Sequence, residues 1–391
     1  MGGRAAGERE RSTPVRSRRT PLARLGPALL ALGSTLFCLA LGEVVLRGRA
    51  HLQARGLLTP DLELPVDPLP GTRVQLGEMI RRSANRRIIY ELRPNLRVVY
   101  QGAPVTTNAA GFRGPAIAAT KPAGVERIVG IGDSFMFGQG VADHETHLAR
   151  LEARRGGSVE TANLAVPGYN AAMEVETLLE KGLRLRPDIV VIEFIGNDLD
   201  LPNFIAAEPQ VLSLRRWFLA DFVAQRLRSR RRAAGNGLVD APRDTWDGEK
   251  YRSDPDSVPP AYRDLVGWPA VERAYRTLHA ASVEHGFRLV LLRWDSIADE
   301  RRLVALAESL GFVVLNLSPL VETRARELGY PSWIESPLVL SQRDNHPSAM
   351  AHDLVSEAVE RVLVEQCLLP PSNSNGATGG GGFWGAEPPA R

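Results

Sequence analysis

This chain of 391 residues has only two cysteines, Cys38 and Cys367. Cys38 lies in a long apolar stretch and Cys367 lies near the end of the chain, so we expect no disulfide between them. A disulfide-stabilised scaffold is therefore excluded. The acidic, histidine and cysteine residues also form no compact metal-ligand motif. We expect the protein to use neither a metal nor another cofactor.

A strong charge of one sign is also lacking over most of the chain. The formal net charge is +3, whereas residues 1–24 alone carry seven arginines and two glutamates, a net of +5. The remaining residues therefore carry a net charge of −2. Because the basic residues belong to one terminal arm, the sequence predicts no nucleic-acid-binding surface.

An uncharged apolar stretch covers residues 25–42 and continues past Glu43 through residues 44–46. It is long enough to span a bilayer. More arginines precede it than follow it, which predicts a cytoplasmic N-terminus and an extracytoplasmic main domain, in the periplasm or at the cell surface. We interpret residues 25–46 as a retained single-pass anchor. The alternative is a cleaved signal peptide with residues 40–42 at its cleavage site.

Alternating strand and helix patterns cover residues 125–367, after a linker and a small β extension at 47–124. This alternation predicts an α/β fold with three α/β/α layers around a mainly parallel, flavodoxin-like sheet of about five strands. We expect these strands to begin near Arg127, Ser158, Asp188, Arg288 and Phe312. Residues 368–391 are rich in proline, serine and glycine, which predicts a disordered tail.

Two segments lie outside the predicted sheet: the extension, which precedes its first strand, and an insertion, which follows its third. Residues 87–100 predict two short strands around Pro94, and residues 107–114 predict a turn. We expect this region to cover a sheet edge, or alternatively Asn108 or Arg113 to reach the mouth of a site. The insertion at about 199–266 predicts a lid, an interfacial helix on anionic lipid or a solvated helix. The apolar face of that helix would contain Leu214, Trp217, Phe218, Phe222 and Leu227.

Four short blocks place polar groups at the predicted carboxyl ends of strands. Gly132-Asp133-Ser134 follows the first strand, where the serine would be exposed in a strand-to-helix turn, and Gly168 lies in the loop after the second. Asn197-Asp198 follows the third strand, and Asp344-Asn345-His346 precedes the last helix. Ligands bind at this edge of open α/β sheets. A serine, a histidine, a carboxylate and preformed donors are the groups that acyl transfer requires.

These blocks resemble those of the SGNH hydrolases, the GDSL-like esterase and lipase superfamily, over residues 126–364. The resemblance implies that Ser134 is the nucleophile and His346 the general base. It implies an oxyanion hole formed by the backbone N–H groups of Ser134 and Gly168 and the side chain of Asn197. The commonest family pattern has the acid three residues before the histidine, where this chain has Arg343. Asp344 stands two residues before, as in some membrane-anchored and polysaccharide-modifying members.

Other interpretations of single residues remain open. Asp133 and Asp198 are expected to support the site rather than react. Ser134 could be a helix N-cap, Gly168 a simple turn residue and Asn197 an Asx-turn residue.

No catalytic role is expected for the remaining histidines, and one other serine-hydrolase motif is excluded. We expect His144 and His147 to be solvated, and His352 to be a surface or packing residue of its helix. The G-x-S-x-G elbow of α/β-hydrolases is absent, because Met136 stands at its second glycine.

The combined interpretation is a membrane-anchored serine esterase. It would hydrolyse a carboxylic ester, such as an O-acetyl or other short acyl ester of a small molecule, glycan or lipid, through a Ser-His-Asp acyl-enzyme. One alternative is an O-acyltransferase that moves the acyl group to an envelope glycan. Another is a non-catalytic glycan-binding or scaffold module.

Overall fold

The computed structural model describes residues 21–54, 68–118, 120–206, 217–227, 238–241, 253–294 and 300–371. Most of the basic arm, nearly all of the predicted tail, and Leu214 lie outside these ranges. The chain divides into two units. The smaller comprises residues 1–59 and 208–229, and the larger comprises residues 60–207 and 230–391.

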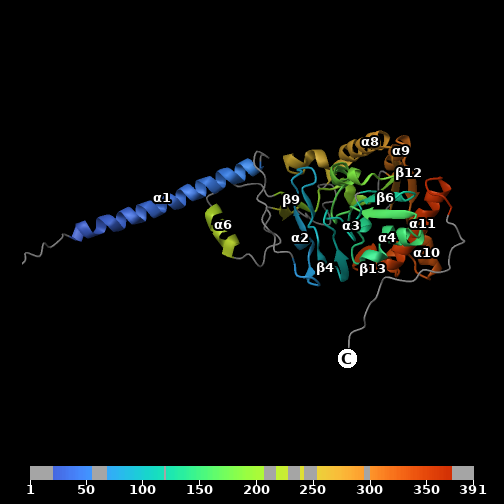
Figure 1. Ribbon diagram of the computed structural model, residues 1–391, viewed down its shortest axis with the longest axis horizontal. Coiled ribbons are helices and arrows are strands. Elements are labelled where there is room, and N and C mark those ends of the chain that lie inside the picture. Colours follow the sequence, from blue (N-terminus) through green and yellow to red (C-terminus); the bar gives the residue numbers. More distant parts are fainter. Residues whose placement is uncertain are drawn as a thin grey trace, which may run out of the picture. The chain divides into compact units, whose positions relative to one another are not determined.

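A five-stranded parallel sheet forms the centre of the larger unit (Figure 1). Its strands are β6 (Glu126–Ile131), β7 (Val159–Asn163), β8 (Ile189–Phe194), β11 (Arg288–Arg293) and β12 (Val313–Asn316). Their order is β12-β11-β8-β6-β7. This order is flavodoxin-like, so the predicted strands and sheet topology are confirmed.

Alternating apolar residues bury both faces of this sheet, as expected for parallel strands covered by helices. Ile128 and Val129 of β6 belong to two different core clusters, and so do neighbouring residues of β8 and β11. One cluster includes α4 (His147–Arg154), α10 (Ser318–Glu327) and α11 (Ala349–Glu365). The other includes α5 (Ala171–Thr177), α8 (Gly267–His285) and α9 (Glu300–Ser309). The sheet with these two helix layers gives the predicted three-layer architecture.

The extension is more structured than the sequence predicts. It contains β1 (Arg73–Val74), α2 (Leu76–Met79), β2 (Ile80–Arg82), β3 (Tyr90–Leu92), β4 (Arg97–Tyr100) and β5 (Ala103–Thr106). The two strands expected around Pro94 are present as β3 and β4. They do not pair with each other, because β3 pairs with β2 and β4 lies between β1 and β5. Apolar residues of the extension join the core cluster that includes α4 and α11.

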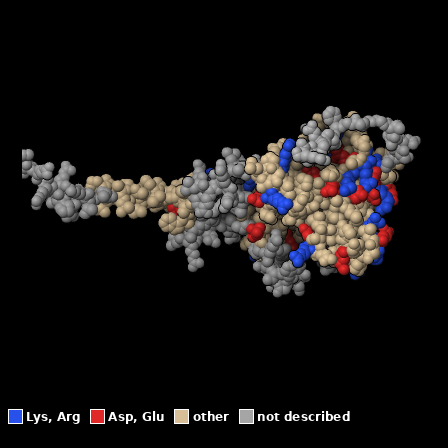
Figure 2. Space-filling view, turned by 90° about the horizontal axis from the view of Figure 1, so that it is seen from below, with Lys and Arg blue, Asp and Glu red and all other residues tan. Residues whose placement is uncertain are grey.

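Two short antiparallel strand pairs complete the larger unit. In the insertion, β9 (Phe204–Ala206) pairs antiparallel with β10 (Leu238–Asp240). Near the C-terminus, β13 (Val339–Ser341) pairs antiparallel with β14 (Asp344–Pro347). Basic and acidic residues are interspersed on the face of this unit drawn in Figure 2. Among the paired charges, Arg154 of α4 contacts Asp353 and Glu357 of α11.

The smaller unit contains α1 (Pro21–Ala54) and α6 (Phe218–Leu227). Within α1, residues 29–52 have a mean hydropathy of 2.1 and are long and apolar enough to cross a membrane. Glu43 of α1 accepts hydrogen bonds from the backbone N–H groups of Phe218 (3.0 Å) and Leu219 (2.7 Å). The guanidinium of Arg47 lies 5.1 Å from the centre of the Phe218 ring. Among the described residues, the helix expected in the insertion therefore contacts the apolar N-terminal helix.

Candidate active site

The serine of the Gly-Asp-Ser block follows the carboxyl end of β6, which lies between β8 and the edge strand β7. β6 ends at Ile131, and the single-turn helix α3 (Ser134–Phe137) begins at Ser134. Asp133 is the N-cap of α3, since its Oδ1 accepts a hydrogen bond from the backbone N–H of Phe135 at 2.9 Å. Ser134 is therefore the first helical residue and not the cap. It is 8% exposed, so the expectation of an exposed serine is wrong.

His346 contacts this serine, and Asp344 contacts the opposite nitrogen of the histidine ring. The Nε2 atom of His346 is 2.8 Å from Ser134 Oγ. Its Nδ1 atom is 2.5 Å from Asp344 Oδ1. Asp344 Oδ1 also accepts a hydrogen bond from the His346 backbone N–H at 3.2 Å. A carboxylate at Nδ1 favours the tautomer whose Nε2 is unprotonated and can accept the serine proton.

Aromatic rings pack beside the imidazole. The ring centre of Phe135, the residue after the serine, lies 5.1 Å from that of His346 and 5.3 Å from that of Trp294. The Trp294 indole N–H donates a hydrogen bond to Glu193 Oε1. These contacts fix the apolar wall behind the histidine, because edge-to-face aromatic pairs have defined geometry.

The side chain of Asn197 is linked to the serine through Asp133. Asn197 Nδ2 donates a hydrogen bond of 2.8 Å to Asp133 Oδ2, which lies 3.3 Å from Ser134 Oγ. A carboxamide nitrogen carries two N–H donors, so one N–H of Asn197 holds the Asp133 contact and the second can serve another acceptor. Asp198 Oδ2 accepts the backbone N–H of Ile195 at 2.6 Å, the backbone contact expected of a supporting residue.

Gly168 has a backbone conformation that other residues rarely adopt. Its φ angle is +79°, and a Cβ atom there would lie 2.2 Å from Asn203 Nδ2. The Gly168 carbonyl accepts a hydrogen bond from the Asn203 backbone N–H at 3.2 Å. The left-handed conformation and the close approach of Asn203 both require glycine here.

Three buried carboxyl groups lie behind the serine and Asn197. Burial raises the pKa values of Glu174, Glu193 and Asp198 well above their usual range. The neighbouring carboxylates raise them further, with Asp133 acting on all three. Low-dielectric surroundings disfavour the ionised form of a carboxyl group. Their buried surroundings therefore disfavour the ionised forms of these side chains.

Sequence reasoning missed Gln139, which contacts the histidine, and Tyr100, which contacts Gln139. Gln139 Nε2 lies 3.2 Å from His346 Nδ1, and its Oε1 accepts a hydrogen bond of 2.7 Å from the Tyr100 hydroxyl. Both side chains are buried. The Gly138-Gln139-Gly140 run after the serine was the available signal, because paired glycines mark a turn close to the block.

The other histidines differ partly from expectation. His144 is exposed, as predicted, but His147 is only 1% exposed. Its Nδ1 atom lies 3.1 Å from the Nδ1 atom of His352, which is fully buried. The expectation of a solvated His147 is wrong, because the first turn of α4 faces α11. Among the described residues, no group of three or more histidine, cysteine or acidic side chains could hold a metal ion.

Asn108 and Arg113 contact other parts of the protein. Asn108 Oδ1 accepts the backbone N–H groups of Ala110 and Phe112, which forms the predicted turn. The Arg113 backbone N–H donates to the Asn163 carbonyl of the edge strand β7 at 3.1 Å. This contact provides the predicted cover of a sheet edge.

Comparisons with known proteins give similarities in structure only. No protein-family profile matches this chain, and no curated protein matches it.

Several solved structures are similar to this chain. One is from Desulfitobacterium hafniense DCB-2 and is described as lipolytic, of the G-D-S-L family. It has 14% identity and a TM-score of 0.36, covering 61% of this chain and 99% of the other. An acetylxylan esterase of Geobacillus stearothermophilus, solved as a catalytic mutant, has 13% identity and a TM-score of 0.37, covering 62% and 96%. A lipase/acylhydrolase of Enterococcus faecalis has 14% identity and a TM-score of 0.34, covering 62% and 97%. Over about three-fifths of its length, this chain is thus similar to solved structures described as esterases and lipases.

Proposed function

We propose that this protein is a serine esterase that hydrolyses a carboxylic ester through a covalent acyl-enzyme. The observation that carries the proposal is the continuous contact from Ser134 Oγ to His346 Nε2 (2.8 Å) and from His346 Nδ1 to Asp344 Oδ1 (2.5 Å). A serine hydroxyl is a weak nucleophile unless an adjacent base accepts its proton. This arrangement supplies the base and a carboxylate that stabilises its protonated form.

The proposed reaction has two acyl-transfer steps. Ser134 Oγ attacks the ester carbonyl carbon while His346 Nε2 takes the serine proton. The tetrahedral intermediate then expels the alcohol, which receives that proton, and leaves the acyl group on Ser134. Water next attacks the acyl-enzyme with His346 again as the base, which releases the carboxylic acid and restores the serine.

The proposed oxyanion hole consists of the Ser134 and Gly168 backbone N–H groups and the Asn197 carboxamide. Its support is the orientation of Asn197 by Asp133 at 2.8 Å and the left-handed backbone of Gly168. Donors that are already in place when the oxyanion forms lower the barrier most effectively. Asp133 and Asp198 would then hold the donors without reacting.

A fluorophosphonate probe tests this proposal directly, because it reacts covalently with activated serines. The full chain, purified in detergent, would be labelled and mapped by mass spectrometry. We expect the label on Ser134, its loss in Ser134→Ala, and normal labelling in the matched control Ser158→Ala. Ser158 is remote, because it precedes the amino end of β7 whereas Ser134 follows the carboxyl end of the parallel strand β6. Its hydroxyl donates to the Arg155 carbonyl at 2.8 Å. Folded wild-type protein that takes up no label would contradict the proposal.

The membrane anchor is a further part of the proposal. Its support is the apolar segment 29–52 of α1, preceded by an arginine-rich arm. The retained anchor predicts that the mature protein keeps residues 1–24 and stays with the membrane after carbonate extraction. A mature chain that begins after Gly42, found by intact mass, would instead identify a cleaved signal peptide.

A further inference from the structure

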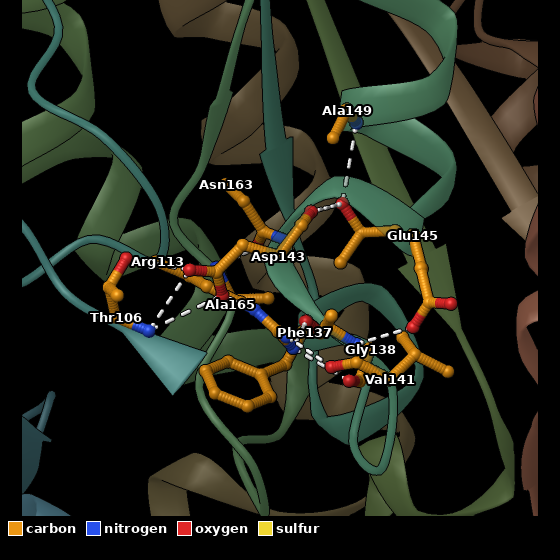
Figure 3. Close-up of polar contacts among 12 residues, drawn as sticks. Thr106, Arg113, Phe137, Gly138, Val141, Asp143, Glu145, Ala149, Asn163 and Ala165 are labelled. Carbon is orange, nitrogen blue, oxygen red and sulfur yellow. Dashed lines mark hydrogen bonds and ion pairs between the residues drawn. The ribbon is translucent and has the colours of Figure 1, made fainter. Parts of the chain in front are cut away.

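One buried arginine holds the segment that follows the serine-bearing helix. Arg113 Nη1 donates to the carbonyls of Phe137 and Gly138, the latter at 2.6 Å, and its Nη2 donates to the Val141 carbonyl at 2.6 Å (Figure 3). The guanidinium also lies 4.4 Å from the centre of the Phe137 ring. Arg113 is 3% exposed, so water does not replace these contacts. Residues 137–141 are therefore held by a side chain from outside the parallel sheet.

A second residue of the extension, Thr106 of β5, is linked to the same arginine through Asp143. Arg113 Nε pairs with Asp143 Oδ1 at 3.0 Å, and Asp143 Oδ2 accepts hydrogen bonds from Thr106 N (3.0 Å) and Thr106 Oγ1 (2.6 Å). These contacts are seen together in Figure 3. Asn163, whose carbonyl accepts the Arg113 N–H, also donates from Nδ2 to the Met136 carbonyl at 2.8 Å. Thus the carbonyls at the C-terminal end of α3 are bound from the extension and from β7.

This binding bears directly on Ser134 because α3 is a single turn. An isolated turn of helix has little stability of its own and leaves its last carbonyls without intrahelical partners. The Ser134 carbonyl accepts the backbone N–H groups of Gly138 (3.1 Å) and Gln139 (3.0 Å). Any displacement of residues 137–141 is therefore passed to the main chain of the serine.

The held segment also reaches the histidine. Gln139 lies within it, with Nε2 3.2 Å from His346 Nδ1 and Oε1 bonded to the hydroxyl of Tyr100 on β4. Arg113 and Tyr100 both belong to the region that the sequence predicts as edge cover. A covering role alone does not explain why two of its side chains enter the contacts around the serine and the histidine.

We propose that the N-terminal extension is a component of the active site, in which Arg113 is a positioning residue for Ser134. This inference rests on the proposed serine-esterase function. Arginine suits the role because its planar fork can donate to several carbonyls at once, whereas a lysine ammonium is a compact point charge on a flexible stem.

The test compares two buried arginines in the full chain. Arg127 lies on β6 and is fully buried; it donates to the Leu185 and Ala118 carbonyls and pairs with Glu160. It lies near the amino end of β6, remote from the serine. Arg113→Lys and Arg127→Lys would be compared for thermal unfolding and for the fluorophosphonate constants kinact and KI, corrected for the folded fraction.

We expect Arg113→Lys to lower kinact about a hundredfold with KI nearly unchanged, because small misplacements of a reacting group have effects of this size. Arg127→Lys should lower the unfolding temperature and leave kinact unchanged. If Arg113→Lys does not fold, Asp143→Asn is the second variant, and it too should lower kinact. Folded Arg113→Lys, or folded Asp143→Asn in its place, with wild-type kinact would overturn this inference while leaving the esterase proposal intact. Absence of labelling in wild-type protein would overturn both.

Discussion

Asp344 and His346 stand two residues apart on β14, and Asp344 Oδ1 lies 2.5 Å from His346 Nδ1. Side chains two positions apart on a strand point to the same face. This alternation explains how a carboxylate at this spacing can reach the imidazole. Arg343, three residues before the histidine, is exposed in the turn between β13 and β14.

The first prediction concerns this carboxylate. Asp344→Asn should lower kcat for p-nitrophenyl acetate about a thousandfold or more, because an amide at this position favours the wrong imidazole tautomer. The double variant Arg343→Asp/Asp344→Asn should remain equally slow, since residue 343 is not on the histidine side of the strand. Recovery of activity in the double variant would show that the acid can act from three residues before the histidine.

The second prediction concerns the amide at the end of β8. Asn197→Ala should lower kcat about a hundredfold or more, since it removes one donor of the proposed oxyanion hole. Asn345→Ala is the matched control, because Asn345 is exposed beside His346 and should retain wild-type kcat. Equal activity of the two variants would assign Asn197 to the turn alone.

The third prediction is an acid-dependent loss of stability from the buried histidines. Burial lowers the pKa of His147 to about 4, and burial with the neighbouring His147 lowers that of His352 well below its usual range. In the unfolded chain these two histidines bind protons below about pH 6.5, whereas in the folded protein they stay neutral to a lower pH. Stability therefore falls as the pH drops from about 6.5 toward 4, by up to about 1.4 kcal/mol per pH unit for each histidine.

Urea unfolding between pH 4 and 7.5 would measure this slope. His147→Phe should make the slope shallower, whereas His144→Phe, at an exposed position, should leave it unchanged. An unaltered slope in His147→Phe would show that other groups cause the acid sensitivity.

The fourth prediction concerns Glu174, one of the buried carboxyl groups whose pKa is raised. Burial raises the pKa of Glu174 well above the usual value of 4.5. Above that pH the unfolded chain releases a proton that the folded protein retains, so folding becomes less favourable as the pH rises. Glu174→Gln, which resembles the protonated form, should therefore gain stability over wild type with increasing pH. Thermal unfolding from pH 5 to 8 measures the gain. The surface variant Glu357→Gln should show little change, since exposed ion pairs contribute little.

The parallel sheet was predictable because each of its strands is a short apolar run that can be recognised in the sequence. Buried runs such as 189–194 alternate between two helix layers, and their order along the chain restricts the topology to few choices. The pairing of β3 with β2 was not predictable, since register in short strands depends on tertiary partners.

Some residues around the candidate site could likewise be predicted from the sequence, and others could not. Ser134, Asn197 and His346 occur in short blocks at strand ends, so their positions could be assigned without coordinates. The contacts of Arg113 could not, because its partners at 137–143 lie across a turn and a separate strand, and a buried arginine has no periodic signal. The burial of His147 depends likewise on the packing of α4 against α11.

The 212 residues that separate Ser134 from His346 have a consequence for biosynthesis. At about 5–20 residues per second, roughly 10–40 s pass between synthesis of the serine and synthesis of the histidine. Until β14 is made and paired with β13, the serine lacks the histidine that we propose as its base. A nascent or prematurely terminated chain would therefore carry an unreactive serine, and reactivity would arise only once nearly the whole larger unit has been made.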